Sequence, residues 1–205
     1  LNARISREAL WLAPTVWKQN SEEPDLSVFS SGASVSMGLD LSARQDLTAA
    51  VIAATDENDV THVVPFCFTP TNNLEERSHN DKTPYDVWVR EGKLIAVAGT
   101  SVDYSQVVEY LNAWLSKNEV DVNYICFDRW RIKDFQAAAE EYNFCSWGEW
   151  KEVGQGYRDI SPRCDSTLSA LLEGKIRHGN HALLTMAAAN AIAVSDPSGN
   201  TKLDK

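Results

Sequence analysis

The stretch VSMGLDLSARQDLTAAVIAA, residues 35–54, decides the fold that we expect. Apolar residues alternate with small or polar ones from Val35 to Leu41, and a second apolar run follows from Thr48 to Ala54. Two such runs joined by a short polar turn predict a half-buried β-hairpin. Asp40 therefore lies on a strand, where a carboxylate is costly unless it faces a cleft, a partner or a metal ion. These residues alone leave two readings open, a metal-facing or phosphate-facing acid and a turn-forming Asp at a strand end.

The composition predicts one sizeable globular core. The chain has 205 residues, of which 43% are hydrophobic and 23% are charged. No apolar run approaches the ~20 residues of a membrane span, and the first residues lack the charged-then-apolar order of a secretory signal. We therefore expect a cytosolic protein without a membrane segment. The four cysteines include no CxxC pair, which favours buried free thiols over a zinc site or disulfides.

The charge balance argues against tight, sequence-independent binding of nucleic acid by this chain alone. It has 19 basic and 29 acidic residues, which leaves a formal net charge of -10. Proteins that hold DNA through its phosphates are usually basic. The basic residues do cluster, however, so a local groove is compatible with the sequence. The clusters are Arg129, Arg131 and Lys133; Arg158 and Arg163; and Lys175, Arg177 and His178.

The rest of the pattern predicts a mixed α/β sheet flanked by helices. A third strand at 60–68 follows the hairpin after a short turn, which makes three antiparallel strands. Residues 102–116 have the spacing of an amphipathic helix. This helix leads to a buried strand at 122–127, as a parallel strand requires. The other expected elements are a short helix at 74–78, a strand at 93–98, a helix at 132–142, a strand at 144–150, a helix at 162–173 capped by Ser161, and a helix at 182–194.

Residues 1–34 are expected to form an arm or linker ahead of a domain at 35–205. The beginning carries Trp11 and Trp17 in a short helical pattern. A Pro- and Ser-rich connector then runs to Gly32. This segment is compatible with an arm packed on the domain or with the tail of a preceding domain.

The predicted strand order, with one acid in the first strand and another after the strand at 122–127, is the layout of an RNase H-like fold. These two strands then lie side by side, so Asp40 and Asp128 would be close enough to share a cation. The edge where parallel strands finish is the expected ligand position. Alternatively, Asp128 pairs with Arg129 or Arg131, or it caps the helix that starts at Ile132.

Four separate segments resemble one known protein family. They are GLDLSARQDLTAA (38–50), FDRWRI (127–132) with the following Phe135, SPRCDSTLSALLEGKIRHGNHALLTMAAANA (161–191) and DPSGNTKLDK (196–205). In this order they resemble the C-terminal nuclease domain of the large subunit of tailed-bacteriophage terminases. The resemblance extends over nearly the whole chain. It implies a metal-dependent endonuclease that cuts concatemeric double-stranded viral DNA into packaged lengths.

The resemblance also implies a set of site residues. It places the family's acidic triad on Asp40, Asp128 and Asp196, which would hold two Mg²⁺ or Mn²⁺ ions through hard oxygen ligands. By local pattern alone, Asp196 suits a type I turn instead. The competing third acids are Glu173 and Asp165, and Asp46 is a candidate for a supporting role. The candidate DNA-contacting residues are Arg129, Arg131, Lys175, Arg177 and His178.

The partners implied by the resemblance are an upstream ATPase domain of the same polypeptide, a small terminase subunit and a portal protein. The expected location is the host cytoplasm, at the procapsid portal during packaging. The chain contains no GxxxxGK[ST] motif, so it would not translocate DNA by itself.

Two other classes of protein are compatible with the sequence. The GLDLS hairpin also resembles the first phosphate loop of actin-like ATPases, although no second Asp-Gly-Gly motif follows. A non-catalytic RNase H-like module that docks on a portal or partner subunit would suit the acidic composition.

Overall fold

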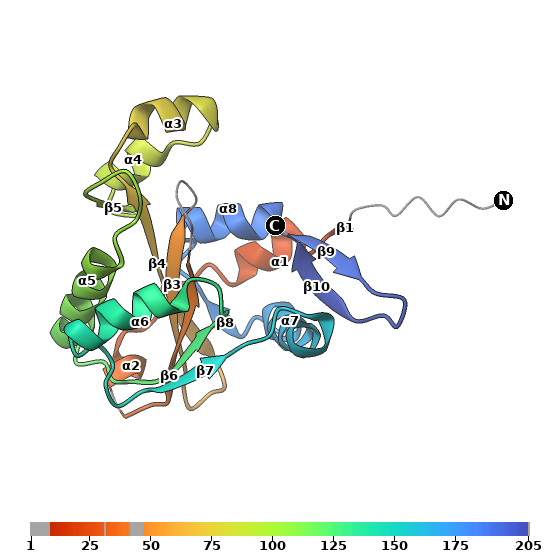
Figure 1. Cartoon of the computed structure of the whole chain (residues 1–205). Helices are drawn as coiled ribbons and strands as arrows, with labels where there is room; N and C mark the ends of the chain where they lie inside the picture. The colour runs from red at the N-terminus through yellow and green to blue at the C-terminus, as the bar shows by residue number, and fades with distance from the viewer. Residues whose placement is uncertain (1–8, 31, 42–46, 205) are drawn as a thin grey trace.

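A seven-stranded mixed sheet forms the centre of the fold in the computed structural model, which describes residues 9–30, 32–41 and 47–204 (Figure 1). The strand order is β5-β4-β3-β2-β6-β7, and β8 pairs with β4 outside this path. The strands are β2 (Val35–Asp40), β3 (Thr48–Thr55), β4 (Thr61–Pro70), β5 (Ile95–Val97), β6 (Val122–Phe127), β7 (Glu149–Glu152) and β8 (Ile176–Arg177).

The pairing of these strands confirms the predicted RNase H-like layout. β2, β3 and β4 are antiparallel neighbours, whereas β6 runs parallel to β2 and β7 runs parallel to β6. Helix α5 (Tyr104–Lys117) carries the chain from β5 across to β6, because a parallel strand needs a long crossover connection. β2, the first strand of the hairpin, and β6 therefore lie side by side.

Helices cover both faces of the sheet (Figure 1). The main core lies under α5 and α6 (Ile132–Glu141), with α2 (Ser27–Ser30) at its margin. The other face packs against α1 (Pro14–Gln19), α7 (Tyr157–Leu172) and α8 (Ala182–Asn190). Helices α3 (Leu74–Asn80) and α4 (Tyr85–Arg90) follow the end of β4, and α4 is an element that the sequence analysis did not predict. Within the described ranges, no helix has the length and apolarity to cross a membrane.

Residues 9–30 are an integral part of the packing. Asn20 is fully buried, and its amide donates to the backbone oxygens of Val16 and Leu171 while its Oδ1 accepts from the Ile176 N–H. The Trp17 ring stacks on His178, with ring centroids 3.8 Å apart. These contacts join α1 to α7 and β8, so the part of the N-terminal segment that the structure describes forms an arm packed on the domain.

Two element boundaries differ from the prediction. The strand expected at 144–150 begins only at Glu149, because the preceding residues form turns in which the Gly148 N–H donates to the Cys145 oxygen. The helix expected at 162–173 already begins at Tyr157, so Pro162 lies inside it. Ser161 is therefore not its cap, and its Oγ accepts from the Thr201 N–H instead.

The helix expected at 182–194 is wrong in its last part. α8 ends at Asn190, and the chain continues as β9 (Ile192–Ser195). β9 pairs with β1 (Ala9–Leu10) on one side and β10 (Thr201–Asp204) on the other, which makes a separate three-stranded sheet. β-Branched residues such as Ile192 and Val194 fit a strand that has partners on both sides.

The four cysteines are free thiols, as predicted. Cys67 and Cys164 are buried, and Cys126 and Cys145 are half-buried. Burial raises the pKa of Cys67 to about 11 and contributes most of the rise that brings the pKa of Cys145 to about 12. Neither thiol is therefore ionised near neutral pH.

Candidate functional site

Asp40 and Asp128 lie next to each other at the edge of the sheet that is formed by the carboxyl ends of β2 and β6. Asp40 is the last residue of β2, and Asp128 directly follows β6. The two strands are parallel, with Leu39 opposite Phe127, so each acid is the next residue in the same register. Neighbouring strands are about 4.8 Å apart. The predicted adjacency of these two acids is therefore confirmed.

The alternation of side chains directs both acids away from the main core. Val35, Met37 and Leu39 are buried in the core beneath α5 and α6, whereas Asp40 is exposed. Phe127 packs against the same core. Because successive side chains of a strand point to opposite faces, Asp40 and Asp128 belong to the face that carries α7 and α8. Because Leu39 and Phe127 face the core under α5 and α6, the carboxylates that follow them are directed to the opposite face of the sheet.

A backbone hydrogen bond orients the Asp128 carboxylate. Its Oδ1 accepts from the Trp130 N–H at 2.7 Å. Within the part of the chain that the structure describes, Asp128 forms no ion pair with Arg129 or Arg131. It is not the cap of α6 either, because Arg131 occupies that position with a φ of 57°. The structure therefore contradicts the ion-pair and helix-cap readings of Asp128.

Asp196 does not join this pair, so the structure does not bring together the three acids of the predicted triad. Its Oδ1 accepts from the backbone N–H groups of Ser198 and Asn200, and its Oδ2 accepts from the Asn200 amide. These bonds close the β9–β10 hairpin, where the Gly199 N–H also donates to the Asp196 oxygen. Among residues 9–30, 32–41 and 47–204, no group of three or more His, Cys, Asp or Glu side chains is placed to hold a metal ion. Asp196 has the turn role that its local pattern suggested.

The competing third acids form no metal-holding group with the pair in the described residues either. Glu173 follows the end of α7 and forms an ion pair with Lys175. Asp165 is exposed on α7. Asp46, the candidate for a supporting role, lies outside the described residues.

Lys175, Arg177 and His178 belong to the opposite end of the sheet. β8 pairs with the beginning of β4, and Thr61 of β4 lies opposite Thr55 of β3. Asp40, in contrast, lies opposite Ala49. The strand between Ala49 and Thr55 is roughly 20 Å long. This separation removes the three residues from the surroundings of the carboxylate pair.

The contacts of these three residues are structural. Lys175 pairs with Asp59 and Glu173, and the Arg177 Nε pairs with Glu22 at 2.6 Å. His178 is 1% exposed; its Nε2 lies 3.0 Å from the Trp17 oxygen, and its Nδ1 accepts from the Asn180 N–H. A buried ring cannot reach a DNA backbone, so the prediction that His178 contacts DNA is wrong.

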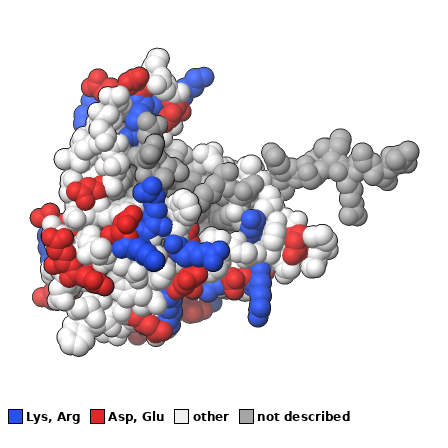
Figure 2. All heavy atoms as spheres, in the orientation of Figure 1, with Lys and Arg blue, Asp and Glu red and all other residues white. Residues whose placement is uncertain are grey.

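Arg129 and Arg131 follow Asp128 directly and are both exposed. Arg131 hydrogen-bonds the Tyr104 phenol; burial raises the pKa of Tyr104, and the positive charge of Arg131 opposes that rise. Figure 2 shows Lys and Arg side chains near the middle of one face, beside a dense group of Asp and Glu side chains where Figure 1 draws α5 and α6. The molecule therefore offers basic side chains locally in spite of its negative net charge.

A groove that the sequence analysis missed lies between the loop after β5 and helix α6. Its volume is about 650 Å³, and its lining includes Gly99, Thr100, Ser101 and Arg131. β4 and β2 are both antiparallel to β3, and β5 is parallel to β4, so β5 and β2 run in the same direction. The groove therefore begins at the same edge of the sheet as Asp40 and Asp128. A Gly-Thr-Ser sequence between a predicted strand and a predicted helix was the available signal.

The whole chain, residues 1–205, matches the family described as terminase large subunit, endonuclease domain. The chain belongs to this family. It is 43% identical over 205 residues to the terminase large subunit of Enterobacteria phage HK97, and this match covers 100% of the chain and 39% of the relative. The chain thus spans about two fifths of the length of that relative. Membership of the family does not support the reading as an actin-like ATPase fragment.

Solved structures agree with this assignment. The crystal structure of the HK97 bacteriophage large terminase matches with a TM-score of 0.87 and 43% identity, and covers 96% of this chain and 40% of that one. The large terminase nuclease from thermophilic phage G20c matches with a TM-score of 0.51 and 11% identity over 88% of this chain and 75% of that one. A second structure of the G20c nuclease, with bound magnesium, matches with a TM-score of 0.50 and 12% identity, over 88% of this chain and 74% of that one. At such low identity the G20c matches show likeness of fold alone.

Proposed function

We propose that this domain is a metal-dependent endonuclease that cuts double-stranded DNA, with Asp40 and Asp128 as the ligands of its metal. The observation that supports the proposal best is the shared register of β2 and β6, which sets the two acids side by side at the ends of parallel strands. Ligands of open α/β sheets bind outside this edge. The family to which the chain belongs is an endonuclease family.

The donor set fits a hard divalent cation. Mg²⁺ and Mn²⁺ prefer oxygen ligands, and Mg²⁺ is commonly held by one or two carboxylates together with water and substrate phosphates. Asp40 and Asp128 provide two such carboxylates, and the Trp130 N–H orients the second. When bound, the cation would neutralise charge on the phosphate and acidify a water molecule. The magnesium bound to the G20c nuclease, a protein of similar fold, is compatible with this choice.

A second cation requires further ligands. The part of the chain that the structure describes holds no third His, Cys, Asp or Glu side chain beside the pair. We therefore propose Asp40 and Asp128 as the ligands of one cation. A second Mg²⁺ or Mn²⁺ would depend on DNA phosphate oxygens, water or residues outside those described.

Arg129 and Arg131 are proposed to contact the DNA backbone next to the cleavage site. Both are exposed and follow Asp128, and guanidinium groups are well suited to phosphate. Contacts of this kind position DNA without reading its sequence. Since the net charge of the chain is -10, we expect the domain alone to bind DNA weakly and to cut with little sequence preference.

The role in packaging is part of the same proposal. The domain would cut concatemeric DNA in the host cytoplasm, at the procapsid portal, as one part of a longer terminase large subunit. An ATPase domain of the same polypeptide, a small terminase subunit and a portal protein are the proposed partners. The share of the HK97 relative that the chain covers, 39%, leaves room for such a domain in a protein of that length.

Cleavage of plasmid DNA tests the proposed function. Asp40→Asn and Asp128→Asn each remove a negative ligand and are expected to lower the rate of Mg²⁺- or Mn²⁺-dependent nicking by more than about 100-fold, since a metal would no longer be held firmly. Glu109→Gln, an exposed carboxylate on α5, which covers the other face of the sheet, is the matched control and should cut normally. Circular dichroism is the control that checks whether each variant is folded.

The same assay separates the nuclease from a non-catalytic docking module. A docking module would bind partners without nicking DNA at any concentration of metal. Normal nicking by Asp40→Asn, with a folded protein, would instead reject Asp40 as a metal ligand while leaving the nuclease function in place.

A further inference from the structure

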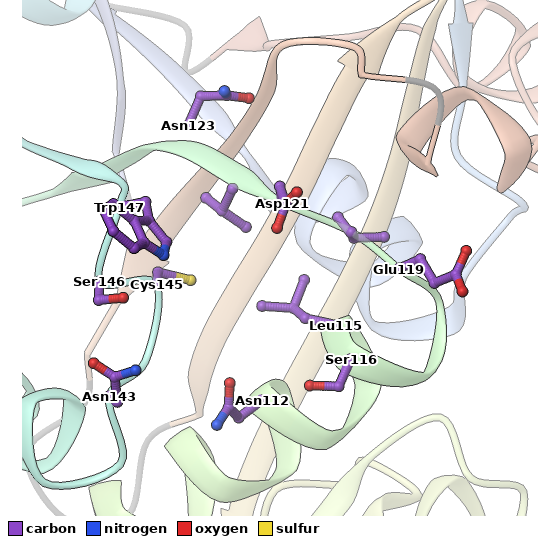
Figure 3. A pocket seen from close by; sticks show the side chains of 12 residues that line it. Asn112, Leu115, Ser116, Glu119, Asp121, Asn123, Asn143, Cys145, Ser146 and Trp147 are labelled. Atoms are coloured by element: carbon purple, nitrogen blue, oxygen red, sulfur yellow. The ribbon is translucent and has the colours of Figure 1, made fainter.

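A polar cavity lies at the edge of the sheet opposite to the carboxylate pair. Its volume is about 670 Å³, and it surrounds the beginning of β6 at Val122. Asp128 follows the other end of this strand, roughly 20 Å away. Figure 3 shows the lining, in which Trp147 and Glu119 stand on opposite sides with Asp121 between them. The cavity is therefore separate from the proposed nuclease site.

Trp147 is the most exposed large side chain of this region, with 98% of its surface accessible. It occupies the turn from Cys145 to Gly148, which is closed by the hydrogen bond from the Gly148 N–H to the Cys145 oxygen. At Gly148, a Cβ atom would lie 2.9 Å from the Val122 oxygen, so only glycine allows the turn to approach β6 this closely. The backbone turn is thus well defined, and it presents the Trp147 ring to solvent.

The chemistry of the lining is acidic and polar. Glu119 and Asp121 contribute carboxylates, and no Lys or Arg lines the cavity. Neither acid has a salt-bridge partner among residues 9–30, 32–41 and 47–204. The pKa of Cys145 is raised first by burial and then by the charge of Asp121, so this carboxylate already acts on its neighbours. The cavity therefore presents negative charge that the domain does not neutralise.

We propose that this cavity is a docking site for a basic segment of a protein partner, with an Arg or Lys side chain over the Trp147 ring. A cation over an indole face is attracted by the ring, and the carboxylates of Glu119 and Asp121 would accept charge-assisted hydrogen bonds from it. Tryptophans at the centre of interfaces often dominate binding. DNA is a poor occupant, because its phosphates would face two uncompensated carboxylates.

Titration with peptides tests the docking site. The indole N–H resonance of Trp147, assigned with Trp147→Phe, is followed by NMR while a hexa-arginine peptide is added to the ¹⁵N-labelled chain. We expect this resonance to shift more than that of Trp130, which is 64% exposed elsewhere. Glu119→Gln/Asp121→Asn should weaken binding at least about tenfold, as should Trp147→Ala in a calorimetric titration.

A matched double variant controls for net charge. Glu75→Gln/Asp165→Asn removes two exposed carboxylates on α3 and α7, so it changes the charge of the chain equally. It should leave the affinity for the peptide within about twofold. Equal weakening by both double variants would overturn the proposal, since it would show unspecific attraction. A shift of Trp147 by a short DNA duplex, with none by the peptide, would also overturn it and point to nucleic acid instead.

The nuclease assay separates this inference from the proposed function. Glu119→Gln/Asp121→Asn lies far from Asp40 and Asp128, so metal-dependent nicking should be unchanged. Loss of peptide binding with normal nicking is the expected result. Loss of nicking together with loss of peptide binding would contradict the separation of the two sites.

Discussion

At the scale of single residues, the position of an Asp in the fold determines which partners its carboxylate has. The carboxylates of Asp128 and Asp196 both accept hydrogen bonds from backbone N–H groups that follow them in the chain. Asp128 directly follows the strand beside Asp40, whereas both carboxylate oxygens of Asp196 are engaged in its own turn. Two acids with similar local hydrogen bonds therefore have different surroundings. The difference lies in which strand each one follows.

Asp196→Ala is expected to destabilise the β9–β10 hairpin and to leave metal-dependent nicking intact. Hydrogen bonds from Asn200, with smaller contributions from Ser198 and Gly199, hold the pKa of Asp196 below its usual value of 3.8. Because the folded-state pKa is the lower one, the stabilisation is fully present above pH 3.8 and is lost as pH falls through the folded-state pKa. Melting temperatures should therefore differ between wild type and variant at pH 7 and converge towards pH 3. A gap that widens on acidification would be the opposite result.

His178 is expected to make stability depend on pH near neutrality. Burial lowers its pKa below 6.5, against the opposing effect of the hydrogen bond with the Trp17 oxygen. A lowered pKa means that the unfolded chain binds the proton more readily, so this contribution is full above pH 6.5 and is lost as pH falls. His178→Gln should reduce the change in urea midpoint between pH 7.5 and pH 5.5. NMR should also show a His178 pKa below 6.5, and a value above 6.5 would refute the account.

At the scale of elements, the N-terminal arm and β8 stabilise each other. Asn20 bridges α1 to Leu171 and Ile176, and the His178 N–H donates to the Asn20 oxygen. The Gly179 N–H donates to the Glu22 oxygen in the same segment. The arm thus supplies hydrogen-bond partners for buried backbone groups. We expect the domain to lose much of its stability without it.

Asn20→Ala is expected to lower the free energy of unfolding by about 2 kcal/mol, because it leaves the buried Ile176 N–H without its partner and removes one of the donors to the Leu171 oxygen. Urea denaturation followed by circular dichroism measures the change. Lys18→Ala, an exposed position on the same helix, is the control and should cost less than about 0.5 kcal/mol. Similar losses in both variants would show that the side-chain bonds of Asn20 contribute little.

At the scale of the whole molecule, we propose that the sheet carries one functional site at each end of its strands. The edge where β2 and β6 end carries Asp40 and Asp128, and the opposite edge carries the acidic cavity with Trp147. A net charge of -10 suits protein contacts better than strong binding of DNA. In the function that we propose, the domain would cut DNA that its partners deliver, while a protein partner would occupy the other edge.

Local patterns were sufficient to predict the centre of the fold. Short turns between 35 and 68 indicate antiparallel strands, and the helix before β6 indicates a parallel one. This order is that of an RNase H-like fold, in which the first and fourth strands are neighbours, and the layout predicted that Asp40 lies beside Asp128. β9 was missed, because the small apolar residues of 182–194 also suit a helix, and one of its partners, β1, lies far away in the chain. The burial of His178 was missed for the same reason, since it depends on Trp17. The Asp-Pro-Ser-Gly turn at Asp196 was the available signal for the β9–β10 hairpin.

Anomalous diffraction from crystals soaked in Mn²⁺ is the most direct test of the central claim, that the ends of β2 and β6 form a metal site. We expect an anomalous peak beside the carboxylates of Asp40 and Asp128, and its loss in crystals of Asp40→Asn. A Mn²⁺ peak on Asp196 with none between Asp40 and Asp128 would contradict it.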